Sequence, residues 1–191
     1  MTADHLPTPV QDIAVPENSG LAVLGTARVS RSADAPPTRR IPSFYADPAS
    51  WAVLEAVDAL RAGCPEVTAA PETTATVMVT THSTLDTMRV IAGGLPGGRV
   101  SPLRFAGANA GGPVSLVCMT HGLRGPTLTL TSDGTEGAPT ALTMARHWLR
   151  TGAADRVVIV AHHHDAALGR HEVRCAAVGA APDLRPQGAR R

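Results

Sequence analysis

Apolar residues of this chain gather in short runs that Gly, Pro and polar residues separate. Runs that are continuous or rich in β-branched residues predict strands over residues 21–29, 73–80, 126–132, 156–161 and 170–177. Apolar residues at helical spacing predict helices from Asp47-Pro48 to Gly63, from an N-cap at Ser83 to Gly93-Gly94, over 109–121 and over 137–151. The segments between them, 30–47 and 95–107, are expected to be loops. Strands that alternate with helices predict an α/β protein, in which a mostly parallel mixed sheet has helices on its faces.

A chain of 191 residues is long enough for one domain with its own hydrophobic core. Residues 1–19 are polar and rich in Pro, and we expect them to form a disordered N-terminal arm. We expect one folded domain over residues 20–181 and a disordered tail over residues 182–191.

Charge and composition exclude several classes of function. A nucleic-acid surface needs a clustered basic face, whereas this chain has a net charge of +1, with 17 basic and 16 acidic residues. The N-terminus lacks the features of a signal peptide, and no stretch reaches the roughly 20 apolar residues of a membrane span. We therefore expect neither a nucleic-acid partner nor a membrane, and a cytoplasmic location.

The cysteines give no sign of a cofactor or metal. Cys64, Cys118 and Cys175 are widely spaced and include no C-x-x-C pair. Their pattern is typical of reduced thiols in a cytosolic protein. We expect no cofactor and no structural zinc.

The segment from Gly122 to Gly137 predicts an apolar strand that enters a tight turn and opens a helix. Enzymes use that geometry to present a nucleophile at the end of a sheet, but the residue at the tip is Gly134. We expect Gly134 to relax a strained turn, because glycine tolerates a positive φ. The flanking Asp133 and Glu136 are candidates for acid–base work if burial separates their pKa values. Charges at the start of a helix are the favoured interpretation of this pair.

A second candidate site is His162-His163-His164-Asp165, which follows the strand at 156–161. On a strand, His162 and His164 would share a face and could bind a metal together with a carboxylate or histidine from elsewhere. Four other histidines are scattered along the sequence, at His82, His121, His147 and His171. We therefore favour polar packing or a subunit contact for this cluster and expect no metal.

Several spaced motifs together resemble the N-terminal half of the β-ketoacyl synthases, which have the thiolase fold. The motifs are Val114-Ser115, Gly122-Leu-Arg-Gly-Pro126, Leu128-Thr129, Gly137 with Ala141-Leu142, and Leu149 to Val157 with its Gly-Ala-Ala-Asp. They follow one another in the family's order, and the resemblance covers about residues 20–180. It implies a thiolase-like half-domain.

The resemblance also implies where chemistry is lost. Aligned on Gly125-Pro126 and Gly137, the catalytic cysteine of the condensing members falls at Gly134. In the related chain length factors, which partner a condensing subunit, this cysteine is also replaced, commonly by Gln. In the family, two catalytic histidines come from a C-terminal half that this sequence does not reach. We therefore expect neither the nucleophile nor the histidine pair.

From this resemblance we expect a non-catalytic ketosynthase-like subunit in polyketide or fatty-acid-type biosynthesis. It would form a homo-oligomer or a heterodimer with a true ketosynthase, pair through the strand that leads into the turn, and work near an acyl carrier protein. An alternative is an enzyme with altered chemistry on an acyl thioester, such as a hydrolase or acyltransferase, using His162–His164 or Asp133 and Glu136. A fragment without a function is a third possibility.

Overall fold

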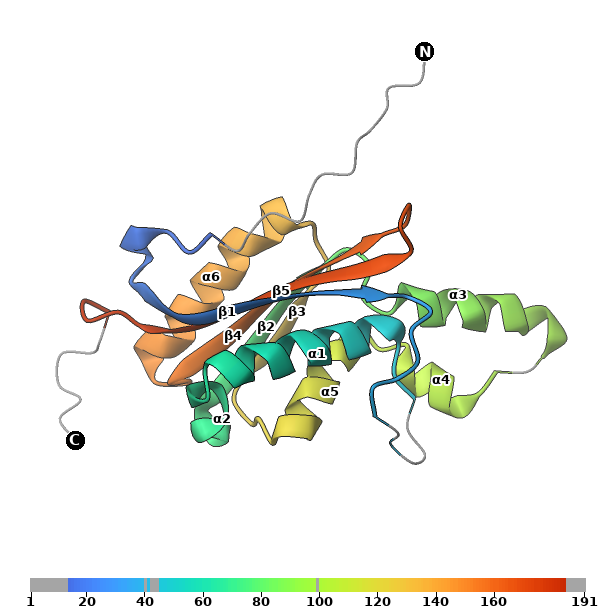
Figure 1. Ribbon diagram of the computed structural model, residues 1–191, viewed down its shortest axis with the longest axis horizontal. Helices are drawn as coiled ribbons and strands as arrows, with labels where there is room; N and C mark the ends of the chain where they lie inside the picture. Colours follow the sequence, from blue (N-terminus) through green and yellow to red (C-terminus); the bar gives the residue numbers. More distant parts are fainter. Residues whose placement is uncertain (1–13, 40, 42–44, 99, 185–191) are drawn as a thin grey trace, which may run out of the picture.

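The predicted strands form one five-stranded sheet in the order β1-β5-β4-β2-β3 (Figure 1). The computed structural model describes residues 14–39, 41, 45–98 and 100–184. Its strands are β1 (Leu21–Ser32), β2 (Thr74–Thr80), β3 (Thr127–Leu130), β4 (Arg156–Asp165) and β5 (Arg170–Ala180). β2 pairs parallel with β3 and β4, whereas β5 pairs antiparallel with β4 and β1. The α/β fold class with a mixed sheet is confirmed, and its parallel part consists of β3, β2 and β4.

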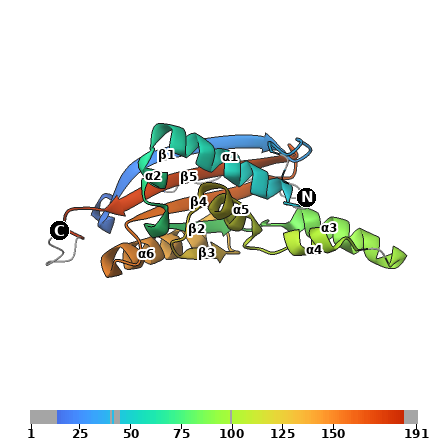
Figure 2. The same ribbon diagram turned by 90° about the horizontal axis from the view of Figure 1, so that it is seen from below.

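Helices cover both faces of this sheet. They are α1 (Pro48–Gly63), α2 (Glu66–Ala69), α3 (Leu85–Gly94), α4 (Pro102–Gly107), α5 (Gly112–His121) and α6 (Gly134–Thr151). α6 lies on one face, α1 and α5 lie on the other, and α3 and α4 project beyond the end of the sheet (Figures 1 and 2). Within the described residues, no helix combines the length and the apolar character that crossing a membrane requires.

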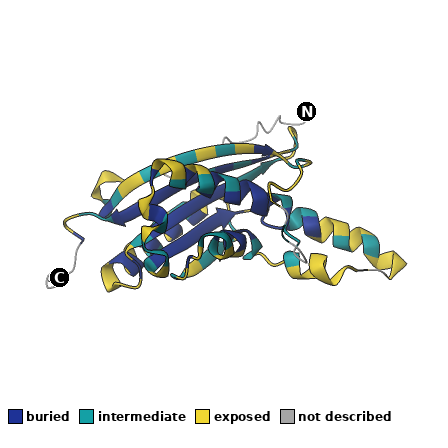
Figure 3. Ribbon diagram, turned by 60° about the horizontal axis from the view of Figure 1, so that its bottom comes forward, coloured by how far each residue is buried: buried dark blue, intermediate teal, exposed yellow. Residues whose placement is uncertain are grey.

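Two apolar layers fill the space between the sheet and its helices. On the α1 side the core contains Trp51, Leu54 and Leu60, and on the α6 side it contains Ala141, Ala145 and Trp148. Small alanines suit α6, because they let a helix approach a sheet closely. β2 is buried along its whole length, as expected of a central parallel strand covered on both faces (Figure 3).

A buried carboxylate ties α1 to the projecting helices. Asp47 Oδ1 accepts a hydrogen bond from the backbone N–H of Ala49 at 2.9 Å, which confirms the predicted start of α1. Asp47 Oδ2 accepts another from the backbone N–H of Thr87, in α3, at 2.8 Å. Burial raises the pKa of Asp47, although these hydrogen bonds oppose the rise. The same side chain therefore caps one helix and fixes the position of a second.

Some predicted boundaries were wrong. The predicted N-cap Ser83 has φ of 48°, and Thr84 occupies the cap position of α3 instead. The segment 95–107, predicted to be a loop, contains α4, which begins at Pro102 and is capped by Ser101. α6 begins three residues before the predicted Gly137, because the Asp133 side chain accepts the backbone N–H of Glu136 at 2.9 Å. Caps and first-turn prolines set these starts, and apolar periodicity does not report them.

The expected arm and tail lie largely outside the described residues, at 1–13 and 185–191. Their described parts contact the domain. Glu17–Ser19 form a turn of 3-10 helix, and Val15 packs against the core on the α6 side. Leu184 is buried in the same cluster. Residues on either side of the expected domain, Val15 and Leu184, therefore pack against it.

We predict that Gly137→Ala destabilises the protein and that Gly134→Ala does not. A Cβ at Gly137 would lie 2.3 Å from Val79 Cγ1, on β2, and 2.6 Å from Ser132 Oγ. Overpacking of this kind costs about 1–3 kcal/mol. A Cβ at Gly134 would meet nothing within 4 Å, so alanine there should be neutral or stabilise the helix by about 0.5–1 kcal/mol. Urea unfolding of the two variants measures both effects, and equal stabilities would contradict the close packing of α6 on β2.

Candidate functional site

Both candidate sites lie at the carboxyl edge of the parallel strands. β3 leads into the turn that contains Gly134, β2 leads to His82, and β4 ends in His162 to Asp165. Parallel strands bring their carboxyl ends to the same edge of a sheet, where α/β proteins commonly bind ligands. β2 lies between β3 and β4. The segment after β3, which contains Gly134, and the histidines at the end of β4 are therefore on opposite sides of the carboxyl end of β2.

Gly134 is the first residue of α6 and not the tip of a strained turn. It is not among the glycines with positive φ, so the predicted positive φ is wrong. Its exposed backbone borders a shallow cavity of about 430 Å³ between α6 and the N-terminal segment, lined in part by Pro16, Leu142 and Arg146. A side chain at position 134 would have open space. The fold therefore accommodates a nucleophile here, but the sequence supplies none.

Asp133 and Glu136 act at the start of α6. Asp133 is the N-cap, and Glu136 is an acidic residue of the first turn, where a negative charge is favourable. Both side chains are exposed, and the pair lacks the burial that acid–base work by paired carboxylates requires. Within the described part of the chain, no hydrogen bond joins Ser132 or Thr135 to a base. The geometry therefore favours a helix-capping role for this pair.

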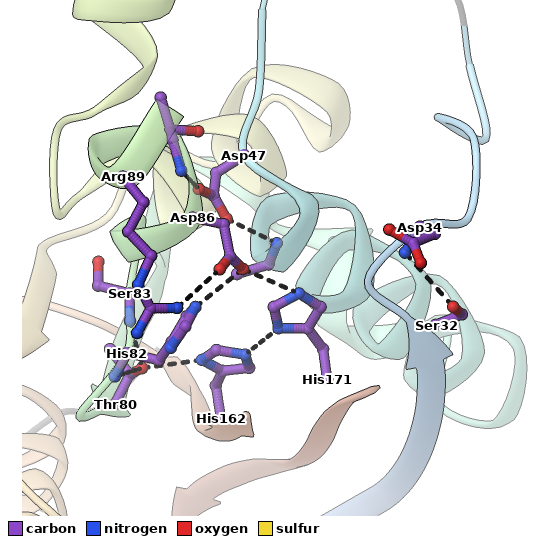
Figure 4. Close-up of polar contacts among 12 residues, drawn as sticks. Ser32, Asp34, Asp47, Thr80, His82, Ser83, Asp86, Arg89, His162 and His171 are labelled. Atoms are coloured by element: carbon purple, nitrogen blue, oxygen red, sulfur yellow. Dashed lines mark hydrogen bonds and ion pairs between the residues drawn. The ribbon is translucent and has the colours of Figure 1, made fainter. Parts of the chain in front are cut away.

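The histidines form a continuous chain of polar contacts (Figure 4). Thr80 Oγ1 lies 2.8 Å from His162 Nδ1, and His162 Nε2 lies 3.0 Å from His171 Nδ1. His171 Nε2 lies 3.5 Å from Asp86 Oδ2. His82 Nε2 lies 2.8 Å from the same carboxylate oxygen. The chain thus leads from the end of β2, through β4 and β5, to the first turn of α3.

The direction of these hydrogen bonds follows from Thr80. Its Oγ1 already accepts the backbone N–H of His82 at 3.2 Å and that of Ser83 at 2.9 Å, so both lone pairs are engaged and its hydroxyl proton donates to His162 Nδ1. His162 then carries its proton on Nε2 and donates it to His171 Nδ1. This places the proton of His171 on Nε2, which faces Asp86. His162 is thereby an acceptor at Nδ1 and a donor at Nε2.

His164 completes the cluster and brings it toward the surface. Its ring centroid lies 4.2 Å from that of His82 and 4.8 Å from that of His171. One ring nitrogen each from His82 and His164 and an oxygen of Asp86 lie within 4.8 Å of one another. His163, at the intervening position of β4, is absent from these ring contacts, as strand alternation requires.

His82 and His171 are not scattered, contrary to the sequence-based expectation. β5 returns antiparallel beside β4 and places His171 directly opposite His164. β2 runs parallel to β4 with Thr80 opposite His162, so His82 follows at the same edge. The turn between β4 and β5 covers residues 166–169, and pairing residues across it places His171 opposite His164. His82 and Asp86 had no such signal, because their position depends on the start of α3.

The two other histidines lie outside this cluster. His121, at the end of α5, is within 3.1 Å of Asp58 Oδ1. His147 is exposed on α6. Neither contacts the rings at the end of β4, so the expectation of scattered histidines holds for these two alone.

Burial favours the neutral form of three of the clustered imidazoles. It lowers the pKa of His162 well below 6.5, and the neighbouring histidines lower it further. Burial and the nearby His164 lower the pKa of His171 to about 4. Burial also lowers the pKa of His164. Burial alone would raise the pKa of Asp86, but the hydrogen bond and charge of His82 outweigh it and leave that pKa lowered. The Asp86 carboxylate thus lies beside imidazoles, those of His164 and His171, whose charged form burial disfavours.

No protein-family model and no curated protein matches this chain. Solved structures do resemble it. The ishigamide ketosynthase/chain length factor is similar over 90% of this chain and 64% of its own, with a TM-score of 0.65 and 16% identity. A ketosynthase (ApeO) in complex with its chain length factor (ApeC), from Xenorhabdus doucetiae, is similar over 85% of this chain and 80% of its own, with a TM-score of 0.58 and 13% identity.

A β-ketoacyl synthase from Burkholderia phymatum STM815 is similar over 89% of this chain and 61% of its own, with a TM-score of 0.64 and 10% identity. These similarities show that the chain has the thiolase-like fold of the ketosynthases, as its motifs predicted. The chain spans less than two thirds of the length of two of these proteins. At such identities the likeness establishes the fold, while function depends on the residues placed upon it.

We predict that the free energy of unfolding falls as the pH falls from 6.5 to about 4. His171 has its pKa lowered to about 4 in the folded protein, so the unfolded chain binds more protons in this window and acid favours it. For His171 alone the loss is about 3 kcal/mol. Urea unfolding in the presence of a chelator measures it. His171→Asn should flatten the pH dependence, whereas His147→Gln, on the exposed face of α6, should retain it. An unchanged slope in His171→Asn would contradict the burial of a neutral imidazole.

Proposed function

We propose that this chain is a non-catalytic subunit of the chain-length-factor type, which pairs with a ketosynthase in polyketide or fatty-acid-type biosynthesis. The observation that carries the proposal is Gly134, at the position where the ketosynthase pattern has its nucleophile. Two of the similar structures are described as a ketosynthase with a chain length factor, which supports pairing as the mode of action. An acyl carrier protein would then deliver the acyl chain to the partner subunit.

The chemistry of condensation explains why a glycine at position 134 argues against catalysis. Claisen condensation needs a thiolate to hold the acyl chain, and glycine has no reactive atom. The start of α6 keeps its cap at Asp133 and its open space without that atom. The site is therefore folded but lacks the group that forms the covalent intermediate. A subunit with such a site contributes by contact and not by bond formation.

The sheet offers an edge for pairing. β3 is the last strand of the sheet and has β2 as its only neighbour among the described strands. Pro126 O accepts the backbone N–H of Thr76 on the β2 side. Parallel alternation then turns the backbone groups of Leu128 toward β2 and those of Thr129 toward the open edge. An unpaired edge favours addition of a strand from another chain.

The projecting helices add exposed apolar surface beyond the end of the sheet (Figure 1). Exposed apolar side chains on α3, α4 and the segment between them are Met88, Val90, Leu95, Val100, Leu103 and Phe105. Phe105 is 70% exposed, the largest exposed fraction of this group. Exposed apolar surface of this kind commonly marks a protein interface. We assign it to the ketosynthase partner, with pairing of two copies of this chain as the competing outcome.

The alternative of altered catalysis on an acyl thioester has less support. Asp133 and Glu136 are exposed helix-start residues. His162 is 4% exposed and has both ring nitrogens engaged, by Thr80 and His171. A buried and fully hydrogen-bonded imidazole has no free atom for a substrate. His163 and His164 are partly exposed, and of these two only His164 contacts the other rings of the cluster.

We predict that co-expression with a ketosynthase encoded beside it yields a stable one-to-one complex. Size-exclusion chromatography with light scattering measures its mass. Thr129→Pro removes the outward N–H of β3 and should weaken the complex at least tenfold, whereas Thr129→Ala keeps that N–H and should not. Phe105→Glu is an independent probe of the apolar surface. The proposed pairing would be overturned if the two proteins failed to associate, or if neither Thr129→Pro nor Phe105→Glu weakened their complex. Formation of homodimers alone would exclude the ketosynthase as the partner.

We also predict that Gly134→Ala leaves product formation by such a complex unchanged, since no reaction passes through residue 134. Rates of product formation with the wild-type and variant complexes measure this. The isolated chain should not turn over an acyl thioester. Turnover by the isolated chain that His162→Ala or His164→Ala abolishes would instead establish the catalytic alternative.

A further inference from the structure

Three potential metal ligands converge at the surface end of the histidine cluster. His82 precedes α3, Asp86 lies in its first turn, and His164 comes from β4. One donor atom from each lies within 4.8 Å of the others. The three side chains are partly buried, with 24% of the Asp86 side chain exposed, so an ion has access from solvent. Two imidazoles and one carboxylate are a donor set that suits zinc and related transition metals.

A buried polar atom points to the same place. The ring of His171 is fully buried, and its Nε2 has no hydrogen-bond partner within the described structure. This nitrogen faces Asp86 Oδ2 at 3.5 Å, too far for a good hydrogen bond. A metal-bound carboxylate is commonly hydrogen-bonded by a group behind it, and such outer contacts orient the ligand. The unpaired Nε2 is therefore placed where a support for Asp86 is needed.

We propose that His82, Asp86 and His164 bind one divalent transition-metal ion, with zinc as the favoured metal, and that His171 positions the carboxylate. Ligand atoms around tetrahedral zinc are about 3.3 Å apart, given metal–ligand bonds of about 2.0–2.1 Å. His82 Nε2 and Asp86 Oδ2 are 2.8 Å apart, so a small separation of these two and an approach of His164 produce the site. The hydrogen bond between His82 and Asp86 is then replaced by two bonds to the metal.

The surroundings of the three ligands are already fixed. Thr80, His162 and His171 form the hydrogen-bonded chain behind Asp86. Arg89 Nη1 lies 3.3 Å from Asp86 Oδ1, which leaves Oδ2 for the metal. Three protein ligands leave a fourth position for water. Metal binding would join the start of α3 to β4 and so restrain the projecting helices relative to the sheet. This inference does not depend on the proposed pairing, because the isolated chain contains every ligand.

Titration of the isolated, chelator-treated protein with Zn²⁺ tests this proposal. Calorimetry should show one ion bound per chain, and Co²⁺ in its place should give the visible absorption of a low-symmetry site. His82→Ala and Asp86→Asn should abolish stoichiometric binding, and His171→Asn should weaken it about 10- to 100-fold, as loss of an outer contact does. His163→Ala, the neighbouring histidine on the opposite face of β4, and His147→Ala are matched controls that should bind normally.

The metal site can also be tested on the wild-type protein, so the result does not depend on whether a variant folds. In ¹⁵N-resolved spectra of the imidazoles, Zn²⁺ should shift the ring nitrogens of His82 and His164 and leave those of His147 in place. No stoichiometric binding, equal affinity in His82→Ala and the wild type, or shifts confined to His147 would each overturn the metal site. The ketosynthase pairing is measured without added metal, so failure of one proposal leaves the other standing.

Discussion

Burial of β2 on both faces is the constraint on which the rest of the structure depends. The strand has β3 and β4 as neighbours, α6 above it and α5 below it, and every residue from Thr74 to Thr80 is buried. Contact at this strand is so close that Gly125 and Gly137 must be glycine, because a Cβ would lie 2.5 Å from Thr74 O or 2.3 Å from Val79 Cγ1. At the carboxyl end of β2, the Thr80 side chain accepts the backbone N–H of Ser83, in the turn that leads to α3.

The contacts that hold the start of α6 in place do not depend on the side chain at residue 134. Helix α6 is held by Asp133 at its start and by Gly137 against β2, and neither contact involves residue 134. The nucleophile of a ketosynthase pattern can thus be replaced by glycine without a cavity or a broken hydrogen bond. When a reactive side chain makes no contact that the fold needs, it can be replaced without loss of stability. Proteins with the same fold therefore need not catalyse the same reaction. In the proposed function, the surface around this position contacts the partner subunit.

Much of the fold followed from the sequence because its elements are strongly periodic. The buried strand β4, the helices α1 and α6 and the order of the motifs led to the α/β class and the ketosynthase resemblance, which the similar structures confirm. α4 and the first turn of α6 were missed, since capping by Ser101 and Asp133 sets them and their residues include no apolar stripe. The partners of His162 and His164 in the histidine cluster were missed for a different reason. Its members come from three separate segments, and only the antiparallel return of β5 brings His171 opposite His164.

The cluster buries imidazoles where most proteins bury apolar side chains. The free-energy cost of burying these polar groups has to be offset. Burying polar groups costs free energy unless each finds a partner. Thr80, His162 and His171 satisfy one another, yet the chain ends on a buried Nε2 without a hydrogen bond and on a carboxylate that two imidazoles share. Protons are poor partners here, because burial holds the pKa of His171 near 4. A divalent cation supplies the positive charge that the buried site resists taking up as protons, and it accepts lone pairs that neutral imidazoles offer. The unpaired Nε2 of His171, which faces Asp86, and the convergence of His82 and His164 on the same carboxylate are thus both explained by one bound cation.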